Sequence, residues 1–395
     1  MRPEAFAYVA AGAGNERTVA ANRAAFDRWR IVPRMLRDVE RRDTSVELFG
    51  QRLPSPFLLA PVGVLELAHP EADCAVARAA RDTGTAMVFS NQASKPMEGL
   101  ARILEDSPHW FQLYWSRSDA LVESLAARAE RCGCAAIVVT LDTTMLGWRS
   151  RDLEGAYLPF LRGKGIAQYT SDPVFTQLIS EGPVAPPGQQ RRPNLAALRT
   201  LIELTRAYPD GFLRTLRSGR GRAAVQRFIE IYSRPSLTWE TLGFLRERTS
   251  LPIVLKGILH PDDAVRAVAE GVDGVIVSNH GGRQVDGAIA TLEALPAVVA
   301  AVDGRIPVLL DSGVRSGADV FKALALGARA VLIGRPYVYG LAIAGRTGVR
   351  EVSENLAGDF DLTMGLAGRR SVAEIEADAL SPAPGMASQG LEQQS

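Results

Sequence analysis

The chain has 395 residues, of which 47% are hydrophobic and 23% are charged, and its formal net charge is +1. This balance argues against nucleic-acid or membrane partners, and neither an apolar run of about 18 residues nor an N-terminal signal pattern is present. Three cysteines and four histidines argue against a disulfide framework and a histidine metal cluster, so we expect a cytoplasmic protein without a catalytic metal.

The N-terminal region predicts helix followed by a short hairpin strand. Residues 4–28 are alanine-rich and helix-like, with a break at Gly12-Ala13-Gly14. Residues 44–51 alternate polar side chains with apolar ones such as Val46 and Leu48, which is typical of a half-buried strand.

A regular alternation of buried strands and helices begins after this hairpin. The expected strands are residues 57–60, 85–89, 110–113, 136–139, 252–255, 274–277, 306–310 and 330–333. The helix-like segments between them include residues 73–82, 118–131, 261–270 and 317–326. This alternation is the signature of an α/β fold, a (β/α)8 TIM barrel, which we expect as a single domain over residues 1–380.

One interval in this alternation is far longer than the others. An excess of roughly seventy residues, rich in Arg, Gly and Pro, lies between Thr140 and Pro252. Because it follows the fourth strand, it emerges at the face where barrels keep their chemistry, and we expect a solvated lid at about 150–235. Its arginines leave a polyanion site as the alternative. Residues 381–395 are expected to form a disordered tail.

The stretch from Ser278 to Gln284 directly follows the buried run 274–277. Its two glycines allow a sharp bend or a close approach to a ligand. His280 suits a general base near neutral pH, and Arg283 suits a clamp for a carboxylate. A buried structural histidine beside a surface arginine is the alternative interpretation.

Polar side chains also follow other expected strands. Lys256 ends the fifth strand, where a buried ammonium needs an ionic partner or a ligand. We expect it to bind a ligand, and an ion pair with Asp142 or Asp311 is the alternative. After strands seven and eight, Arg315 and Arg335 stand near glycines, which predicts a phosphate site. A buried lysine with nearby amides and hydroxyls suits a planar ring, so a flavin mononucleotide (FMN) accounts for both ring and phosphate.

With these residues assembled, the chain resembles the FMN-dependent L-2-hydroxy-acid oxidase/dehydrogenase family from Tyr8 to Leu380. The motif Ser-Asn-His-Gly-Gly-Arg-Gln at 278–284 carries the resemblance most specifically. Supporting motifs are Phe-Gln-Leu-Tyr at 111–114, Thr-Leu-Asp-Thr at 140–143, Leu-Lys-Gly at 255–257, Asp-Ser-Gly-Val-Arg at 311–315 and Gly-Arg-Pro at 334–336.

The resemblance implies a role for each matching residue. His280 would remove a proton from the hydroxy acid, with Asp142 stabilising the imidazolium. The substrate carboxylate and hydroxyl would be bound by Tyr8, Tyr114, Arg149 and Arg283. The ring and ribityl groups of FMN would be held by Pro61, Val62, Gly63, Ser90, Gln112, Thr140, Lys256 and Ser278. Its ribityl and phosphate end would be held by Asp311, Ser312, Gly313, Arg315, Gly334 and Arg335.

Within the family the chain looks most like lactate 2-monooxygenase, through residues 60–64, 147–152 and 158–173. Gly63 stands where oxidases commonly carry alanine beside the flavin, although simple tolerance of extra space is the alternative. In that enzyme the 2-oxo product stays bound while O2 meets the reduced flavin, and the product is decarboxylated. We therefore expect oxidation of a small L-2-hydroxy acid, foremost L-lactate, with O2 as oxidant and oxidative decarboxylation.

Other outcomes stay open. The chain could be a simple oxidase that releases the 2-oxo acid and H2O2, a dehydrogenase that passes electrons to a quinone or protein, or a maturation flavoenzyme with a larger substrate. A non-catalytic flavin- or phosphate-binding barrel would have lost His280 or Arg283. Asn91 and Gln92 depart from the family pattern and leave L-lactate open as the substrate. The resemblance also implies a homotetramer or homo-octamer. Family members normally have a further helix before the segment that matches Tyr8, so either the native N-terminus is longer or the lid over the far end of the barrel is reduced.

Overall fold

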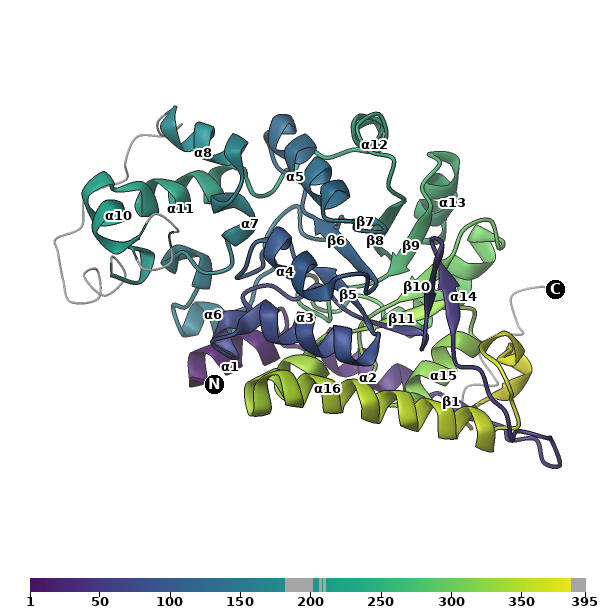
Figure 1. Ribbon diagram of the computed structural model, residues 1–395. Helices are drawn as coiled ribbons and strands as arrows, with labels where there is room; N and C mark the ends of the chain where they lie inside the picture. Colours follow the sequence, from purple (N-terminus) through teal and green to yellow (C-terminus); the bar gives the residue numbers. More distant parts are fainter. Residues whose placement is uncertain (182–201, 206–207, 209–210, 385–395) are drawn as a thin grey trace.

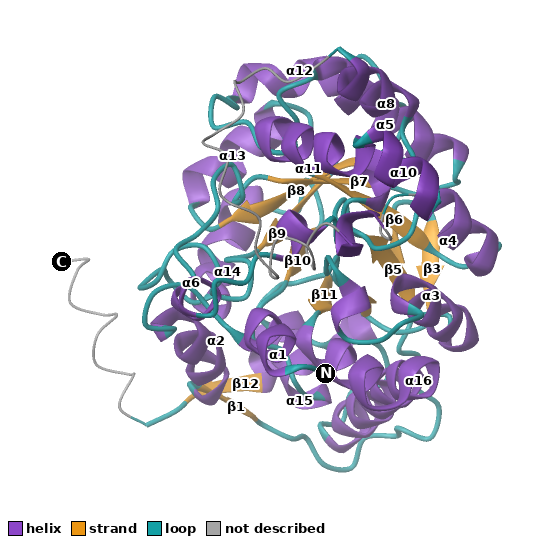
Figure 2. Cartoon of the chain, turned by 90° about the vertical axis from the view of Figure 1, so that its left-hand side faces the viewer, coloured by secondary structure: helices purple, strands orange, loops and turns teal. Residues whose placement is uncertain are grey.

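Eight parallel strands close into a barrel in the computed structural model, which describes residues 1–181, 202–205, 208 and 211–384 (Figures 1 and 2). The hydrogen-bonded order is β10-β11-β4-β5-β6-β7-β8-β9, with β9 closing onto β10. The strands are β4 (Phe57–Leu59), β5 (Ala86–Phe89), β6 (His109–Leu113), β7 (Ile137–Thr140), β8 (Ile253–Ile258), β9 (Gly274–Val277), β10 (Val308–Leu310) and β11 (Ala330–Ile333). Each lies within an expected apolar run or overlaps it, so the predicted barrel is confirmed.

Helices cover the outside of this barrel, and both faces of the strands are therefore buried, as the continuous apolar runs predict. No helix in the described part of the chain is long and apolar enough to cross a membrane. The surrounding helices are α3 (Ala72–Thr83), α4 (Met97–Leu104), α5 (Asp119–Arg131), α12 (Leu242–Arg246), α13 (Pro261–Ala269), α14 (Thr291–Val302), α15 (Gly317–Ala325) and α16 (Arg335–Leu366).

The barrel interior is filled by side chains from alternate strand positions, as the two-residue period of a strand requires. Leu58, Val138 and Leu309 belong to this inner cluster, whereas the neighbours of Leu58 in β4 pack outward against the helices. A hairpin of β2 (Val46–Leu48) and β3 (Gln51–Leu53) closes the amino-terminal end. The open end of the barrel is therefore the one at which the strands finish.

The N-terminal region and the last described residues meet in a small two-stranded sheet. The predicted N-terminal helix is two helices, α1 (Pro3–Ala10) and α2 (Arg17–Asp27), with the expected break between them. Strand β1 (Trp29–Ile31) pairs antiparallel with β12 (Leu380–Pro382). Residues 381 and 382, which we expected in a disordered tail, thus lie in a strand, and residues 385–395 lie outside the described part.

The described part of the expected lid consists of helices that pack beside the barrel (Figure 1). They are α6 (Ser150–Glu154), α7 (Ala167–Thr170), α8 (Pro173–Ser180), α10 (Phe212–Ser218) and α11 (Arg220–Ile231). The ring of Tyr169 lies 4.9 Å from that of Phe228 and 5.5 Å from that of Phe175. These fully buried aromatic rings give the insertion a core of its own, while residues 182–201, 206–207 and 209–210 lie outside the described residues.

Candidate active site

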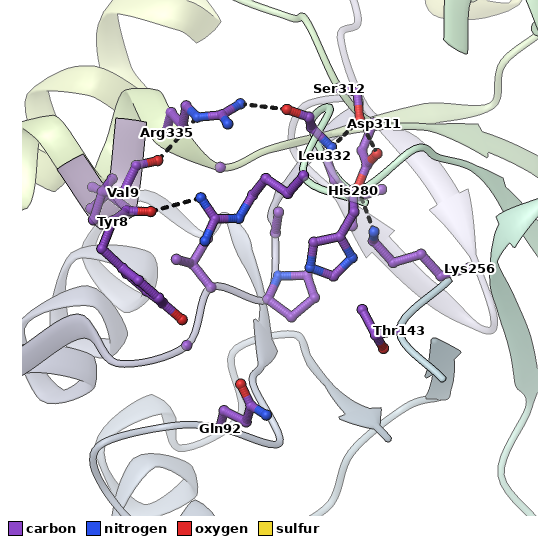
Figure 3. Close-up of a pocket in the computed structure, with 18 of the residues that line it drawn as sticks. Tyr8, Val9, Gln92, Thr143, Lys256, His280, Asp311, Ser312, Leu332 and Arg335 are labelled. Carbon is purple, nitrogen blue, oxygen red and sulfur yellow. Dashed lines mark hydrogen bonds and ion pairs between the residues drawn. The ribbon is translucent and has the colours of Figure 1, made fainter. Parts of the chain in front are cut away.

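An open cavity lies at the carboxyl ends of the barrel strands. Figure 3 shows how Tyr8, His280 and Lys256 reach it from different elements. The predicted site residues that line it are Tyr8, Pro61, Val62, Gly63, Tyr114, Arg149, Lys256, His280, Arg283, Asp311, Ser312, Gly313, Arg315, Gly334 and Arg335. The other predicted residues, Ser90, Gln112, Thr140, Asp142 and Ser278, support this lining from behind through the contacts described below.

His280 is held in an unusual backbone conformation at the end of β9. Its φ is 58°, a left-handed value that costs energy for any residue other than glycine, and the amide of His280 donates to Ser278 Oγ over 3.1 Å. Gly281 and Gly282 continue the left-handed turn. A Cβ on Gly282 would lie 2.7 Å from the backbone nitrogen of Val19, so this turn fits against α2 only with glycine.

The imidazole of His280 is oriented by Asp142, which follows β7. The distance from His280 Nδ1 to Asp142 Oδ1 is 2.9 Å. Burial lowers the pKa of His280, and Asp142 opposes that shift. Burial alone would raise the pKa of Asp142, but His280 and Lys256 outweigh it and lower that pKa. An ionised Asp142 can only accept a hydrogen bond, so Nδ1 of His280 carries the proton. This tautomer leaves Nε2 as the basic nitrogen.

Arg149 and Arg283 lie beside this pair and are bonded only to neutral oxygens in the described part of the chain. Arg283 donates to the carbonyls of Tyr8 and Ala11 over 2.7 and 2.8 Å. Arg149 donates to the carbonyl of Arg283 and to Gln284 Oε1, both over 3.3 Å. Burial and the neighbouring Arg149 lower the pKa of Arg283 to about 9. Two crowded cations without a hydrogen-bonded anionic partner among the described residues fit the carboxylate of a ligand.

Tyr114 presents a protonated hydroxyl to the same space. Burial raises its pKa well above the ordinary value, and Asp142 adds to the rise. Its backbone amide donates to Asn91 Oδ1 over 3.1 Å, which ties the ends of β5 and β6 together. A hydroxyl that stays protonated is a hydrogen-bond donor for a substrate oxygen.

Lys256 makes the ion pair that we considered as the alternative to a ligand-binding role. Its Nζ lies 2.8 Å from Asp311 Oδ2 and donates to Ser278 Oγ over 2.7 Å. Burial alone would lower the pKa of Lys256, but Asp311 and Asp142 outweigh it and raise that pKa. Lys256 and Asp311 both line the cavity, and their ion pair keeps the Lys256 ammonium protonated at the cavity wall.

The residues expected at the flavin ring form a connected polar layer. Ser90 Oγ donates to Gln112 Oε1 over 3.2 Å, and Gln112 Nε2 donates to Thr140 Oγ1 over 3.0 Å. These three side chains are buried and lie on adjacent strands. Their amide and hydroxyl groups, next to the Lys256 ammonium, fit the polar edge of an isoalloxazine ring.

The residues expected at the phosphate provide positive charge and backbone amides. Arg335 donates to the carbonyl of Val9 over 3.1 Å (Figure 3) and to those of Gly281 and Ala11 over 2.9 and 3.0 Å. Its hydrogen-bond partners among the described residues are therefore neutral. Burial lowers the pKa of Arg335, and partial burial together with Arg335 lowers that of Arg315. Arg335 also opens the long helix α16, whose N-terminal amides favour an anion. This donor set fits the phosphate of FMN.

Gly63 does not lie in extra space, which was the alternative explanation for a glycine where oxidases commonly carry alanine. A Cβ built on Gly63 would lie 3.0 Å from Gln92 Cβ and 3.1 Å from the carbonyl oxygen of Gln92. The glycine therefore accommodates close packing between the loops after β4 and β5. It carries no argument for a monooxygenase.

Several residues in or beside the cavity escaped the sequence interpretation. Gln284 bridges two loops: it accepts from the amide of Gly147 over 3.3 Å and donates to the carbonyl of Met145 over 2.9 Å. Its place in the 278–284 motif was the signal that could have revealed this role. Phe160 and Tyr232 line the cavity from the insertion. Phe160 lies in the stretch 158–173 that contributed to the resemblance but received no role there, and no pattern in the sequence marks Tyr232. Gln92, which we noted only as a departure, lines it too.

Comparisons with known proteins agree with this site. A family model described as FMN-dependent dehydrogenase matches residues 1–382. The chain is 42% identical to an L-lactate oxidase of Lysinibacillus sphaericus, over 96% of this chain and 89% of that protein. It is 40% identical to a 4-hydroxymandelate oxidase of Amycolatopsis orientalis, over 93% and 91%. A crystal structure of mandelate oxidase with (S)-4-hydroxymandelic acid superposes with a TM-score of 0.79 at 39% identity, covering 97% of this chain and 95% of that one.

These relatives are named as oxidases rather than monooxygenases, so the expected family is confirmed while the finer likeness to lactate 2-monooxygenase is not. Their cofactor and substrate class match the chemistry that the cavity residues offer. This chain belongs to the FMN-dependent dehydrogenase family and is an FMN-dependent oxidoreductase of 2-hydroxy acids.

Proposed function

We propose that this protein is an oxidase that converts an L-2-hydroxy acid and O2 into the 2-oxo acid and H2O2. The observation that carries the proposal is the His280–Asp142 pair beside two arginines that donate no hydrogen bond to a carboxylate in the described part of the chain. A base next to a carboxylate clamp places the hydroxyl-bearing carbon of a 2-hydroxy acid within reach of the base.

In this proposal each side chain has one task. Arg149 and Arg283 bind the substrate carboxylate, and the hydroxyl of Tyr114 donates to a substrate oxygen. His280 takes a proton from the substrate at Nε2, and the carboxylate of Asp142 stabilises the imidazolium that forms. Bound FMN supplies the two-electron acceptor that O2 reoxidises.

A second group of residues binds the cofactor in this proposal. Lys256 stabilises negative charge on the ring, supported by Ser278 and Asp311. Arg315 and Arg335 bind the phosphate. The substrates named for the relatives range from lactate to 4-hydroxymandelate, so both small and aromatic 2-hydroxy acids belong in the test.

The oxidase outcome is favoured over oxidative decarboxylation for two reasons. The relatives compared above are named as oxidases. In addition, Gly63 is explained by its packing against Gln92 and leaves no structural mark of a monooxygenase. Release of the 2-oxo acid before it meets peroxide is then the expected course.

The test combines flavin reduction with product analysis. Anaerobic mixing with L-lactate or (S)-mandelate should bleach the flavin, while the matching D-enantiomers serve as controls. In air, one H2O2 and one 2-oxo acid should form per substrate oxidised. Stoichiometric CO2 in place of peroxide would instead establish a monooxygenase, and reduced flavin that persists in air would point to a dehydrogenase.

A further inference from the structure

Asp152 is a buried carboxylate next to the proposed clamp, and the mechanism above gives it no task. It lies in α6, three residues after Arg149, whose carbonyl accepts its amide over 3.1 Å. Asp152 is 9% exposed, and neither of its carboxylate oxygens has a hydrogen-bond partner among the described residues. A buried carboxylate without such partners is costly unless nearby cations compensate it.

Arg283 and Arg149 supply this compensation. Burial raises the pKa of Asp152, and the two guanidinium groups oppose that rise. The influence is mutual, because Asp152 also opposes the lowering of the Arg283 pKa that burial and Arg149 cause. In the described part of the chain the partners of both arginines are nevertheless carbonyl or amide oxygens. Asp152 thus acts on the clamp through its charge without occupying its donors.

The charges of this group determine how strongly it attracts an anion. Two guanidinium groups and one carboxylate leave a single net positive charge, which one ligand carboxylate neutralises. Without Asp152 the same ligand would face two positive charges, in a site where water screens them poorly. The other nearby carboxylate, Asp142, is already engaged by His280.

We propose that Asp152 is a positioning residue that weakens the carboxylate clamp by partly neutralising Arg149 and Arg283. The inference rests on the proposed function, since substrate and 2-oxo product share the carboxylate that the clamp holds. A clamp with its full charge would hold the product longer, and slow product release limits turnover in many enzymes. Asp152 therefore favours departure of the 2-oxo acid, as an oxidase requires.

The test measures binding of oxamate, a carboxylate that resembles a 2-oxo acid and cannot be oxidised here. Binding to the FMN-loaded protein is read from the change in flavin absorption, so it needs no turnover. Asp152→Asn should lower the Kd for oxamate about tenfold. The matched control is Glu154→Gln in the same helix, where the lost charge is exposed and screened, so its Kd should stay near the wild-type value.

Turnover provides a second readout. Asp152→Asn should lower KM and kcat together while anaerobic flavin reduction keeps its rate, because product release alone becomes slower. If Asp152→Asn does not retain FMN, Asp152→Ser removes the same charge in a smaller side chain and provides the same comparison.

An unchanged or higher Kd in the charge-removing variant overturns the proposal, since Asp152 would then merely order the arginines or have no electrostatic effect. Failure of the wild-type protein to bind oxamate at all would remove the proposed function, and this inference with it. If the wild-type protein binds oxamate and the Kd of Asp152→Asn is unchanged, only the inference about Asp152 is rejected, and the proposed function stands.

Discussion

His280 has a side chain suited to act as a base, but its backbone conformation is unfavourable for a residue other than glycine. Imidazole is a natural base near neutral pH, but a left-handed backbone at a non-glycine residue is strained. The strain persists because Ser278 Oγ accepts the amide of His280 and because Gly281 and Gly282 complete the turn. Such strain at a strand end is typical of functional sites.

Replacing His280 tests its role as the base. His280→Gln should slow anaerobic flavin reduction by a factor of about 10² to 10⁴, because the proton would have no positioned acceptor. Stopped-flow absorption measures this rate, and the FMN content of the variant should be unchanged. His260→Asn is the control: His260 is exposed and caps α13, a position that asparagine also suits. A reduction rate near wild type in His280→Gln would assign the base to another group.

The pH dependence of the reaction should reflect the same imidazole. Burial lowers the pKa of His280 below its ordinary 6.5, although Asp142 opposes the shift. The neutral form acts as the base, so activity is complete above the folded pKa and is lost as the pH falls through it. The acidic limb of kcat/KM should therefore have its midpoint below 6.5. A midpoint clearly above 6.5 would mean that Asp142 outweighs burial.

Among the helices, one buried arginine, Arg128, links the insertion to the helices that surround the barrel. Lying in α5, it donates to Glu98 Oε1 over 2.7 Å and to Asp172 Oδ2 over 3.0 Å. It also donates to the carbonyl of Gln168 over 2.7 Å and to Ser171 Oγ over 2.8 Å. One buried guanidinium thus joins α5 to α4, α7 and the start of α8.

Removing this cation should therefore be costly. Arg128→Met would leave the fully buried Asp172 without its positive partner, and we expect a loss of about 3–5 kcal/mol in the free energy of unfolding. Urea unfolding of the FMN-loaded protein measures this loss. Arg131→Met in the same helix is the control, because Arg131 is exposed and should change stability by less than about 0.5 kcal/mol. Equal effects of the two substitutions would contradict the anchoring role.

The sequence predicted the barrel strands well and the insertion poorly. The run 274–277 coincides with β9 because a strand covered on both faces must be apolar throughout. The insertion offers no such regularity: its helices are short and its core is a few aromatic rings from α7, α8 and α11. Contacts between distant segments, such as that of Arg128 with Asp172, leave no periodic pattern.

At the scale of the whole molecule, charge is nearly balanced overall but not within the cavity. The net charge is +1, yet Arg149, Arg283, Arg315 and Arg335 all line one space together with Lys256. Such crowding destabilises the fold unless anions bind there. The phosphate of FMN and the substrate carboxylate are the anions that the proposed function supplies.

Removal of FMN should consequently destabilise the whole barrel. At a hundredfold excess of FMN over its Kd, binding contributes about 2.7 kcal/mol, so the apoprotein should melt at a clearly lower temperature. Differential scanning calorimetry with and without FMN measures the shift. Riboflavin, which lacks the phosphate, is the matched control and should restore less stability because Arg315 and Arg335 stay without an anion. Equal stabilisation by riboflavin would contradict the assigned phosphate site.

The sequence by itself determined the fold class and the end of the barrel that carries the chemistry. Short continuous apolar runs that alternate with helical segments indicate strands buried on both faces. A parallel barrel then brings the polar residues that follow these strands to one rim. Only the tertiary structure decided which charges are paired. Lys256 in β8 meets Asp311, which follows β10, across the intervening β9. Arg283 donates to a carbonyl of α1 rather than to a carboxylate, and Asp152 is buried nearby. Pairing depends on distances between remote segments, and those distances exist only once the chain has closed into a barrel.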